Sequence, residues 1–266
     1  MLFSTNSLCR KGRSLHLWLG MFLIGVMGLI LGLLGGGGSI LTVPILVYVL
    51  GMEAHAAIVV SLVLVGGTAL VGALLHQQHC QLAWKQGLLF VAFGAPLNFI
   101  GANVSSRVPA GMLLVLFGLL MGVAGAAMLV KRSEHKNLSG GRSIWPAVAS
   151  GATVGFLAGF LGVGGGFMIV PSLVLFLQMP IKTATGTSLL VITANSCVAL
   201  FGHRHALNPG GLLLLELVPP ALIATYVGVW LAQKLSAHQL REIFGVFVIL
   251  LGVLMAAYNG VILYIR

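Results

Sequence analysis

Acidic residues are almost absent from this sequence of 266 residues, which contains no aspartate and only four glutamates: Glu53, Glu134, Glu216 and Glu242. Charged residues of both signs make up only 7% of the chain, whereas soluble domains carry about 25%. So little charge cannot cover the surface of a soluble fold. Each glutamate lies at or near the end of an apolar run, because a charge at the membrane centre costs roughly 2.5–3.5 kcal/mol. The composition therefore indicates a membrane protein.

The sequence also lacks the residue clusters that metal sites and active sites need. Its three cysteines, Cys9, Cys80 and Cys197, have no metal-type spacing, and no group of histidines could form a metal cage. There is no HExxH motif, no pair of carboxylates and no nucleophile with a partner base. We therefore expect neither a cofactor nor a metal, and we do not expect an enzyme.

Basic residues outnumber acidic ones and give a formal net charge of +10. They are scattered among short loops, so we expect no nucleic-acid partner. Basic residues before the first apolar run and in the central linker place both segments in the cytoplasm under the positive-inside rule, although later loops carry basic residues on both sides. On this reading the two halves enter the membrane in the same direction, and both chain termini are cytoplasmic.

Long runs without charged residues predict the membrane-spanning helices, since about 17–25 apolar residues cross a bilayer as a helix. Six runs fit one ordinary span each: 56–76, 84–103, 110–130, 183–203, 211–233 and 239–264. Two more runs, 14–52 and 143–181, are longer. The pattern predicts an all-α polytopic membrane protein with about eight transmembrane helices.

The sequence matches itself without gaps at an offset of 127 residues. Five of the six glycines and the proline of segment 28–44 recur in segment 155–171, and Ser61 recurs as Ser188. Such a register predicts two tandem four-span helical repeats, 14–130 and 144–264, joined by the polar linker 131–143. Duplicated halves are common in secondary transporters, whose substrate site lies near the midplane between them. Duplication for packing alone is the alternative.

Each repeat opens with a charge-free block of 39 residues, which as one helix would be about 58 Å long. That is about twice the hydrocarbon thickness of a bilayer. Glycines interrupt both blocks, in GLLGGGGSILTVP and in GFLGVGGGFMIVP. We expect each first helix to be broken there, either as a re-entrant hairpin or as an unwound span.

The glycine breaks are candidate anion sites. Irregular backbone at membrane depth must be buried in protein or line a cavity, and the first N–H groups of the helix after a break carry partial positive charge. Glycines let an oxyanion approach those groups closely. The alternative is that they allow helices to cross closely. The candidate residues are Gly35, Gly36, Gly37, Gly38 and Ser39 in the first repeat, and Gly162, Gly164, Gly165 and Gly166 in the second.

Neutral polar residues inside the predicted spans are further candidates, because they can hydrogen-bond an anion without trapping it. Alternatively, they bond backbone carbonyls or neighbouring helices. His76 and His203 match at the same offset and can both titrate. They either couple transport to protons or lie at the membrane interface. The polar anion-binding candidates are Ser61, Thr68, Asn98, Thr187, Ser188, Asn195 and Thr225.

The paired glycine segments ending in Val-Pro, in a gap-free duplication of this size, resemble the sulfite exporter TauE/SafE family of membrane transporters. The resemblance covers residues 14–264 and implies anion transport in the bacterial cytoplasmic (inner) membrane. Members are associated with sulfite, sulfonates and related sulfur-containing organic anions. One departure is Val163, which stands where the first repeat has Gly36.

The sequence therefore predicts a multi-pass transporter that moves a small anion through a site between two repeats. The expected partners are the anion and the lipid bilayer, and a homodimer is left open. A passive anion channel and a non-transporting membrane scaffold are the alternatives.

Overall fold

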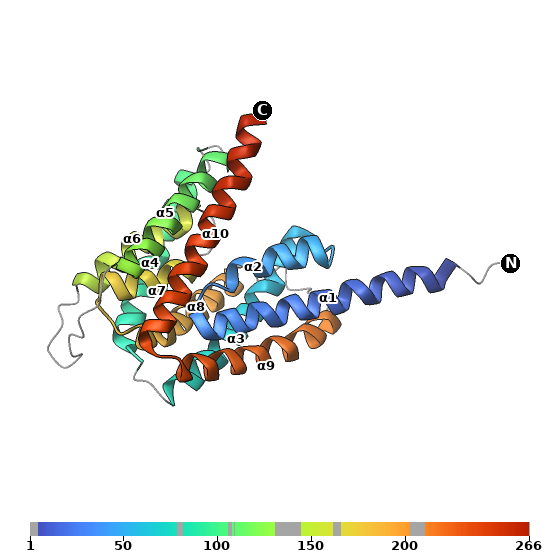
Figure 1. Cartoon of the computed structure of the whole chain (residues 1–266), viewed down its shortest axis with the longest axis horizontal. Coiled ribbons are helices and arrows are strands. Elements are labelled where there is room, and N and C mark those ends of the chain that lie inside the picture. The colour runs from blue at the N-terminus through green and yellow to red at the C-terminus, as the bar shows by residue number, and fades with distance from the viewer. Residues whose placement is uncertain are drawn as a thin grey trace.

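The computed structural model describes residues 5–78, 82–105, 108, 110–130, 145–161, 166–202 and 211–265. These residues form ten α-helices and one π-helical segment, with no strand, which confirms the predicted all-α fold (Figure 1). The elements are α1 (Thr5–Leu34), α2 (Ser39–Pro44), η1 (Ile45–Val49), α3 (Ala54–Gln77), α4 (Trp84–Ser105), α5 (Ala110–Val130), α6 (Trp145–Leu161), α7 (Gly166–Leu175), α8 (Ile181–Gly202), α9 (Gly211–Lys234) and α10 (Ala237–Ile265).

The six predicted ordinary spans correspond to α3, α4, α5, α8, α9 and α10, with boundaries that differ by no more than about two residues. Within the described chain, four helical windows are long and apolar enough to cross a membrane: Ala56–Gln77, Ile181–Phe201, Leu214–Lys234 and Ala237–Leu254. Other apolar helical windows are shorter. The total of about eight crossings stays a prediction.

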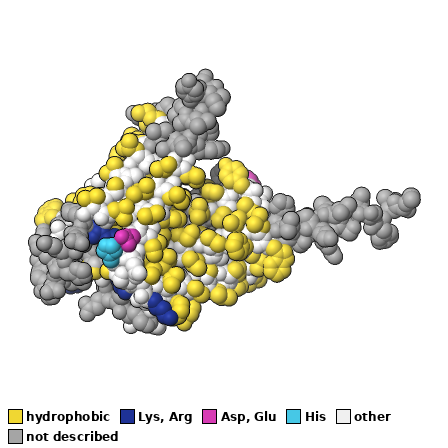
Figure 2. All heavy atoms as spheres, viewed as in Figure 1, with side chains coloured by type: hydrophobic (Ala, Val, Ile, Leu, Met, Phe, Trp, Pro, Cys, Tyr) yellow, Lys and Arg dark blue, Asp and Glu magenta, His cyan; other side chains and the backbone are white. Residues whose placement is uncertain are grey.

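The surface of the fold is apolar to an unusual degree. Large side chains such as Trp18, Phe22 and Leu88 are 67–70% exposed, and hydrophobic side chains cover much of the face in Figure 2. A soluble protein rarely exposes a continuous apolar surface of this kind. The surface therefore fits contact with lipid, as the composition predicts.

The first glycine break is a hairpin. A side chain at Gly20, early in α1, would lie 2.6 Å from the side chain of Leu50, which follows η1. At the other end, Gly38 packs against the backbone of Met27 and the side chain of Leu31. The segment α2–η1 therefore runs back along α1, from the break to the level of Gly20. This decides between the two predicted forms of the first break in favour of the re-entrant hairpin, which is about 21 Å deep at 1.5 Å per residue.

Two helix pairs run parallel and join the two halves of the chain. In the pair α1 and α9, Gly28 packs on Ala221 and Gly32 packs on Thr225; Figure 1 shows these helices side by side. In the pair α4 and α6, Phe90 packs on Gly151 and Gly101 packs on the backbone of residues 156–160. Glycine permits backbone contact in both pairs, as in close helix packing within membranes. Each half thus packs its first helix against a helix of the other half.

Two further pairs are antiparallel. In the pair α3 and α8, Gly66 contacts Ser196 and His76 contacts Gly186. In the pair α5 and α10, Gly118 contacts Gly252 and Leu129 contacts Gly245. Helices α3 and α8 hold matching positions at the 127-residue offset, yet they point in opposite directions. The equal direction of the two halves in the membrane stays a prediction, and the antiparallel pair α3 and α8 counts against it. The hairpin folds back along α1, so three long helices, α3, α4 and α5, lie between it and the second half.

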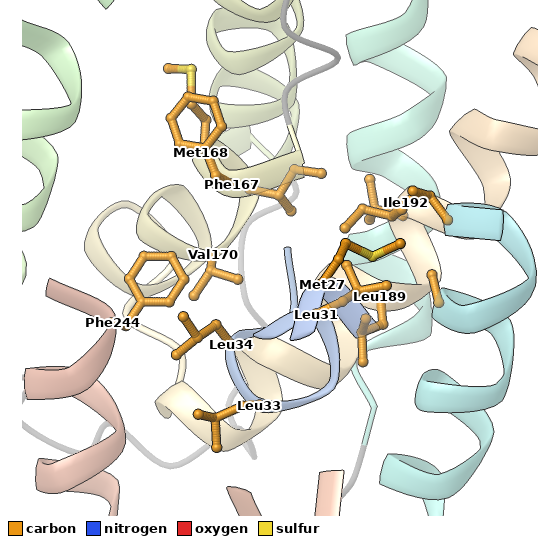
Figure 3. Close-up of a cluster of buried hydrophobic side chains, with 14 of the residues drawn as sticks. Met27, Leu31, Leu33, Leu34, Phe167, Met168, Val170, Leu189, Ile192 and Phe244 are labelled. Carbon is orange, nitrogen blue, oxygen red and sulfur yellow. The ribbon is translucent and has the colours of Figure 1, made fainter. Parts of the chain in front are cut away.

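The core surrounds the end of the hairpin. Figure 3 shows Met27, Leu31 and Leu34 of α1 lying against side chains of α7, α8 and α10. The rings of Phe117 and Phe167 meet edge to face, with centroids 4.9 Å apart. The hairpin tip is therefore enclosed by apolar side chains from both halves.

Candidate functional site

The tip of the first hairpin, residues 35–39, carries unpaired backbone donors. The amide of Gly35 donates to Leu31 O at 2.8 Å, and the amide of Ser39 donates to Gly36 O at 3.3 Å. The three N–H groups between them, at Gly36, Gly37 and Gly38, donate to no acceptor within the described part of the chain. All three glycines are buried.

Three successive unpaired N–H groups in a protein core are unusual. Most buried backbone donors have a partner, and each buried donor left without one costs about 1–3 kcal/mol. Runs of adjacent backbone N–H groups form concave sites for anions. The tip therefore stays a candidate anion site, with donors that lack a partner among the described residues.

The glycines of the tip also pack closely against other parts of the fold. A Cβ on Gly35, whose φ is +74°, would lie 2.7 Å from Ser188 Oγ, and a Cβ on Gly36 would lie 2.2 Å from Gly166 O. Gly37 faces the ring of Phe247 in the same way. Both interpretations of the motif thus find support here, because the Cα atoms make helix contacts while the amides stay unpaired.

The start of α7 reaches the first hairpin at this point. Ser39 Oγ donates to Gly36 O at 2.8 Å, and it would lie 2.6 Å from a Cβ on Gly166, the first residue of α7. The structure therefore brings together Gly36, Ser39 and Gly166 from the predicted set. Gly162, Gly164 and Gly165 lie outside the described residues.

Polar side chains of α8 connect the tip to a buried histidine. The hydroxyl of Ser188 lies 2.5 Å from Gly35 O and 2.7 Å from Thr185 O, so its single proton is donated to one or shared by both. Thr185 Oγ1 is 3.5 Å from Nε2 of His76, whose Nδ1 lies 3.3 Å from Gly72 O. His76 is only 2% exposed, and it lies one residue before the end of α3. Its predicted counterpart His203 lies outside the described residues.

Four other predicted residues have structural hydrogen bonds away from the tip. Ser61, Thr68 and Thr225 donate to carbonyls one turn earlier in their own helices, and Thr225 Oγ1 also lies 3.1 Å from Gly28 O of α1. Thr187 Oγ1 accepts a hydrogen bond from the amide of Ala83 at 3.2 Å. These side chains act mainly in helix packing.

Asn98 and Asn195 meet at a separate place. They line one cavity of about 20 Å³ among α4, α6, α7 and α8, which is enough for one water molecule. At the 127-residue offset, Asn98 corresponds to Thr225 and Asn195 corresponds to Thr68. Thr225 and Thr68 are at most 1% exposed, so the two halves differ in polarity and in packing at matching positions.

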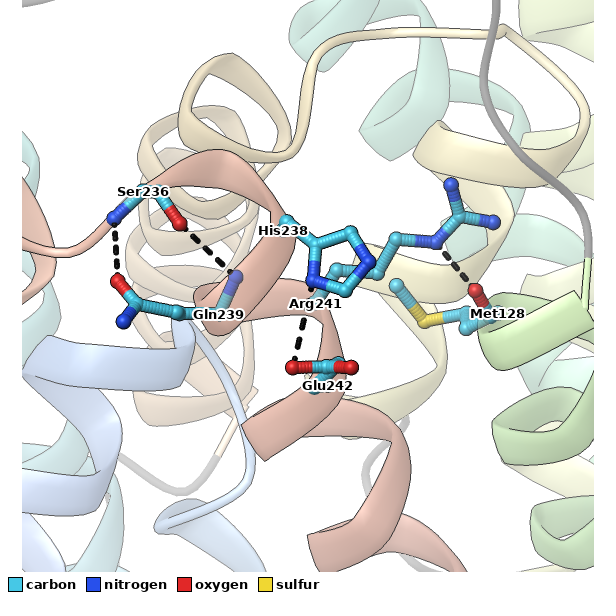
Figure 4. A network of polar contacts seen from close by, with 6 residues as sticks. All are labelled: Met128, Ser236, His238, Gln239, Arg241 and Glu242. Atoms are coloured by element: carbon cyan, nitrogen blue, oxygen red, sulfur yellow. Dashed lines mark hydrogen bonds and ion pairs between the residues drawn. The ribbon is translucent and has the colours of Figure 1, made fainter.

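Sequence reasoning missed Arg241, near the start of α10. Its Nε donates to Met128 O near the end of α5 (Figure 4), and its Nη2 is buried without a partner among the described residues. A cation is favourable beside the carbonyls at a helix C-terminus. The only sequence signal was a basic residue beside an apolar run. Nearby, His238 and Glu242 form a contact of 3.3 Å one turn apart.

Comparisons with known proteins identify the family of this chain. The family model described as sulfite exporter TauE/SafE matches residues 20–255. A probable membrane transporter protein of Xylella fastidiosa is 34% identical over 233 residues, covering 85% of this chain and 89% of the relative. The probable membrane transporter protein YunE of Bacillus subtilis is 28% identical over 258 residues, covering 85% and 94%. No solved structure matches significantly. The chain therefore belongs to the sulfite exporter TauE/SafE family and is a membrane transporter.

Proposed function

We propose that this transporter moves a small oxyanion, such as sulfite, a sulfonate or a related sulfur-containing organic anion, across the bacterial cytoplasmic membrane. The anion binds at the tip of the first hairpin, where the amides of Gly36, Gly37 and Gly38 point to it. The single observation that carries this proposal is the set of three successive N–H groups at that buried tip that have no acceptor among the described residues. The family supports transport of this class of substrate.

The chemistry of the tip suits reversible binding. Backbone donors carry partial charges only, so an anion held by them is not trapped as it would be beside a buried lysine. The core side chains around the tip exclude water and strengthen the hydrogen bonds. The hydroxyl of Ser39, half-buried beside Gly166, can turn from Gly36 O toward a bound oxygen.

The two halves act as inverted repeats around this site. Matching helices α3 and α8 are antiparallel, and matching backbone features recur at the 127-residue offset. Met52 N donates to Leu46 O at 3.0 Å, and Met179 N donates to Leu173 O at 3.1 Å. Gly51 and Gln178, also 127 residues apart, both have positive φ. Inverted repeats with a midplane site between them support alternating access by rocking of one half against the other.

His76 couples transport to protons in this proposal. It is buried between α3 and α8, and the hydroxyls of Thr185 and Ser188 lie between it and the hairpin carbonyl of Gly35. No carboxylate occupies such a position in the described core. The hydroxyl of Thr185 donates to Lys182 O at 2.9 Å, so a protonated Nε2 of His76 would donate to Thr185 Oγ1 as a new, charged donor. This charge changes how tightly α8 holds the hairpin.

The function is tested by counterflow of radiolabelled sulfite, sulfate and a short sulfonate in proteoliposomes, with and without a pH gradient. Saturable counterflow of one anion supports the proposal. Flux without counterflow indicates a passive channel, and no flux of any anion indicates a scaffold. Replacement of His76 by Gln should preserve counterflow and abolish the response to the pH gradient.

The binding position is tested by amide hydrogen exchange of the peptide that contains residues 35–39. A transported anion should slow exchange of this peptide, because it becomes the acceptor for its free amides. The peptide that contains Gly66 and Gly67, within α3, serves as the control. Protection of both peptides, or of neither, would contradict the proposed position.

A further inference from the structure

A groove on the outside of the fold lies apart from the hairpin tip. It is bounded by the end of α3 and the start of α4, and α8 forms its floor; its volume is about 410 Å³. Sites for small ligands commonly have about 300–1,000 Å³. The lining residues are Leu70, Ala73, Leu74, Gln77, Trp84, Lys85, Leu88, Leu190, Thr193 and Ala194.

The walls of the groove are apolar along most of its length. Leu70, Leu74 and Leu88 are 48–68% exposed along its walls. The hydroxyl of Thr193 donates to Leu189 O of its own helix at 2.8 Å, so the groove receives little polarity from it. Such a surface matches a hydrocarbon chain and offers nothing to a small polar substrate.

One end of the groove is polar and basic. Gln77 ends α3, while Trp84 and Lys85 begin α4, and all three side chains are exposed. Tryptophan and lysine at a helix end are typical of the level of lipid headgroups. Lys85 is the only charged residue among those that line the groove. The charge at this end is therefore complementary to a phosphate.

We propose that the groove holds one acyl chain of an anionic phospholipid, with the phosphate against Lys85 and the chain along Leu74 and Leu88. Leu190, in the floor, lies within one turn of Thr187 and Ser188 on α8. Gly87 of α4 also packs on Leu190 and Thr187. The lipid thus stabilises the position of the helix that contacts the hairpin tip.

Native mass spectrometry of the full-length protein in detergent tests this inference. Phosphatidylglycerol and phosphatidylcholine with identical chains are titrated separately. Phosphatidylglycerol should bind more tightly, and Lys85→Gln should weaken its binding about fivefold, the factor equivalent to ~1 kcal/mol for one basic side chain at an anionic membrane surface. Binding of phosphatidylcholine should change less, because its choline group offsets the charge of the phosphate.

Lys234→Gln is the matched control, because Lys234 also accompanies a tryptophan at a helix end, with its ammonium 3.6 Å from the centroid of the Trp230 ring. It should leave binding of phosphatidylglycerol unchanged. Leu74→Trp fills the groove from its exposed wall and should weaken the binding of both lipids. Thermal melting verifies that each variant is folded. Inorganic phosphate should not compete, since it has no acyl chain.

Equal binding of the two lipids would overturn the inference. An equal loss of phosphatidylglycerol binding in Lys85→Gln and Lys234→Gln would also overturn it. So would competition by inorganic phosphate, or full lipid binding by folded Leu74→Trp. A dimer that disappears in Leu74→Trp would instead identify a second copy of the chain as the occupant. These outcomes concern lipid binding alone and are independent of anion flux.

Discussion

At the scale of single residues, the contact between the first hairpin and the start of α7 depends on the absence of side chains. A Cβ on Gly36 would lie 2.2 Å from the carbonyl oxygen of Gly166 and 2.9 Å from its carbonyl carbon. Both of these are backbone atoms, which cannot change rotamer to make room. The contact can therefore tolerate a methyl group only if the hairpin or α7 moves.

We predict that Gly36→Ala lowers the stability of the purified protein by about 1–3 kcal/mol, the usual cost of overpacking. Gly25→Ala is the control, since a Cβ on Gly25 has nothing within 4 Å and alanine favours a helix. Thermal unfolding in one detergent compares the two variants. Equal melting temperatures would show that the hairpin tip does not touch the start of α7.

Ser61 and Ser188 occupy matching positions and differ in what they bond. The hydroxyl of Ser61 bonds Ile58 O of its own helix, whereas the hydroxyl of Ser188 also reaches Gly35 O of the hairpin. We predict that Ser188→Ala costs about 1 kcal/mol of stability and reduces anion counterflow. Ser61→Ala should have smaller effects on both quantities, and the reverse order would contradict this hydrogen-bond assignment.

This pair also shows what the sequence could not reveal. A serine in a helix always has a carbonyl three or four residues earlier within reach, so the sequence cannot say whether the hydroxyl also contacts another element. Ser188 could be chosen as a candidate from its repeat position. Its contact with Gly35, and the separate meeting of Asn98 and Asn195, depend on tertiary packing.

At the scale of elements, the hairpin formed by α1, α2 and η1 is the feature that determines the arrangement of the first half. Its return places Leu50 beside Gly20, with Leu50 Cγ 3.0 Å from an ideal Cβ on Gly20. The Cβ of residue 50 lies one bond from that Cγ, which puts the two Cβ positions within the range that a disulfide spans.

We predict that Gly20→Cys together with Leu50→Cys forms a disulfide under mild oxidation, in a chain whose native cysteines are serines. Gly25→Cys with Leu50→Cys is the control, because Gly25 lies in open space. The bond is measured as a reversible shift of mobility on a gel after proteolysis between the two positions. An unwound, continuous span would separate residues 20 and 50 and give no bond in either variant.

The positions of the long helices could be predicted because they follow from apolar run length, which the bilayer dictates. The π-helical turn after Pro44 could not be predicted. Proline lacks an N–H group and disturbs the helical hydrogen bonds around it, and the chain continues with a bond from Leu50 N to Ile45 O, five residues apart. Several patterns of bonding can follow a proline, and packing selects among them.

At the scale of the whole molecule, the antiparallel relation of α3 and α8 determines the orientation of the two halves. Glu53 precedes α3 and Gln178 lies shortly before α8, and both side chains are exposed. We predict that Glu53→Cys and Gln178→Cys, each in the cysteine-free chain, react with an impermeant maleimide from opposite sides of the membrane. Labelling of intact spheroplasts and of inverted vesicles measures this, and labelling from one side would contradict inverted repeats.

The sequence predicts a duplication, but it does not predict the relative direction of matching helices such as α3 and α8. The positive-inside rule needs a clear bias of basic residues, and here the eight-span count places Lys85 and Arg204 on one side and Arg107 and Lys182 on the other. The sequence also could not show that the first hairpin folds back along α1. That return is a tertiary contact between Gly20 and Leu50.

The parallel packing of α1 on α9 has a consequence for biosynthesis. Two hundred residues separate Leu34, the end of α1, from Lys234, the end of α9. At about 5–20 residues per second, the ribosome needs roughly 10–40 s to make that stretch. During this interval the glycine face of α1 must be shielded by lipid or by the insertion machinery. Degradation of unassembled chains should therefore compete most strongly with folding before α9 emerges.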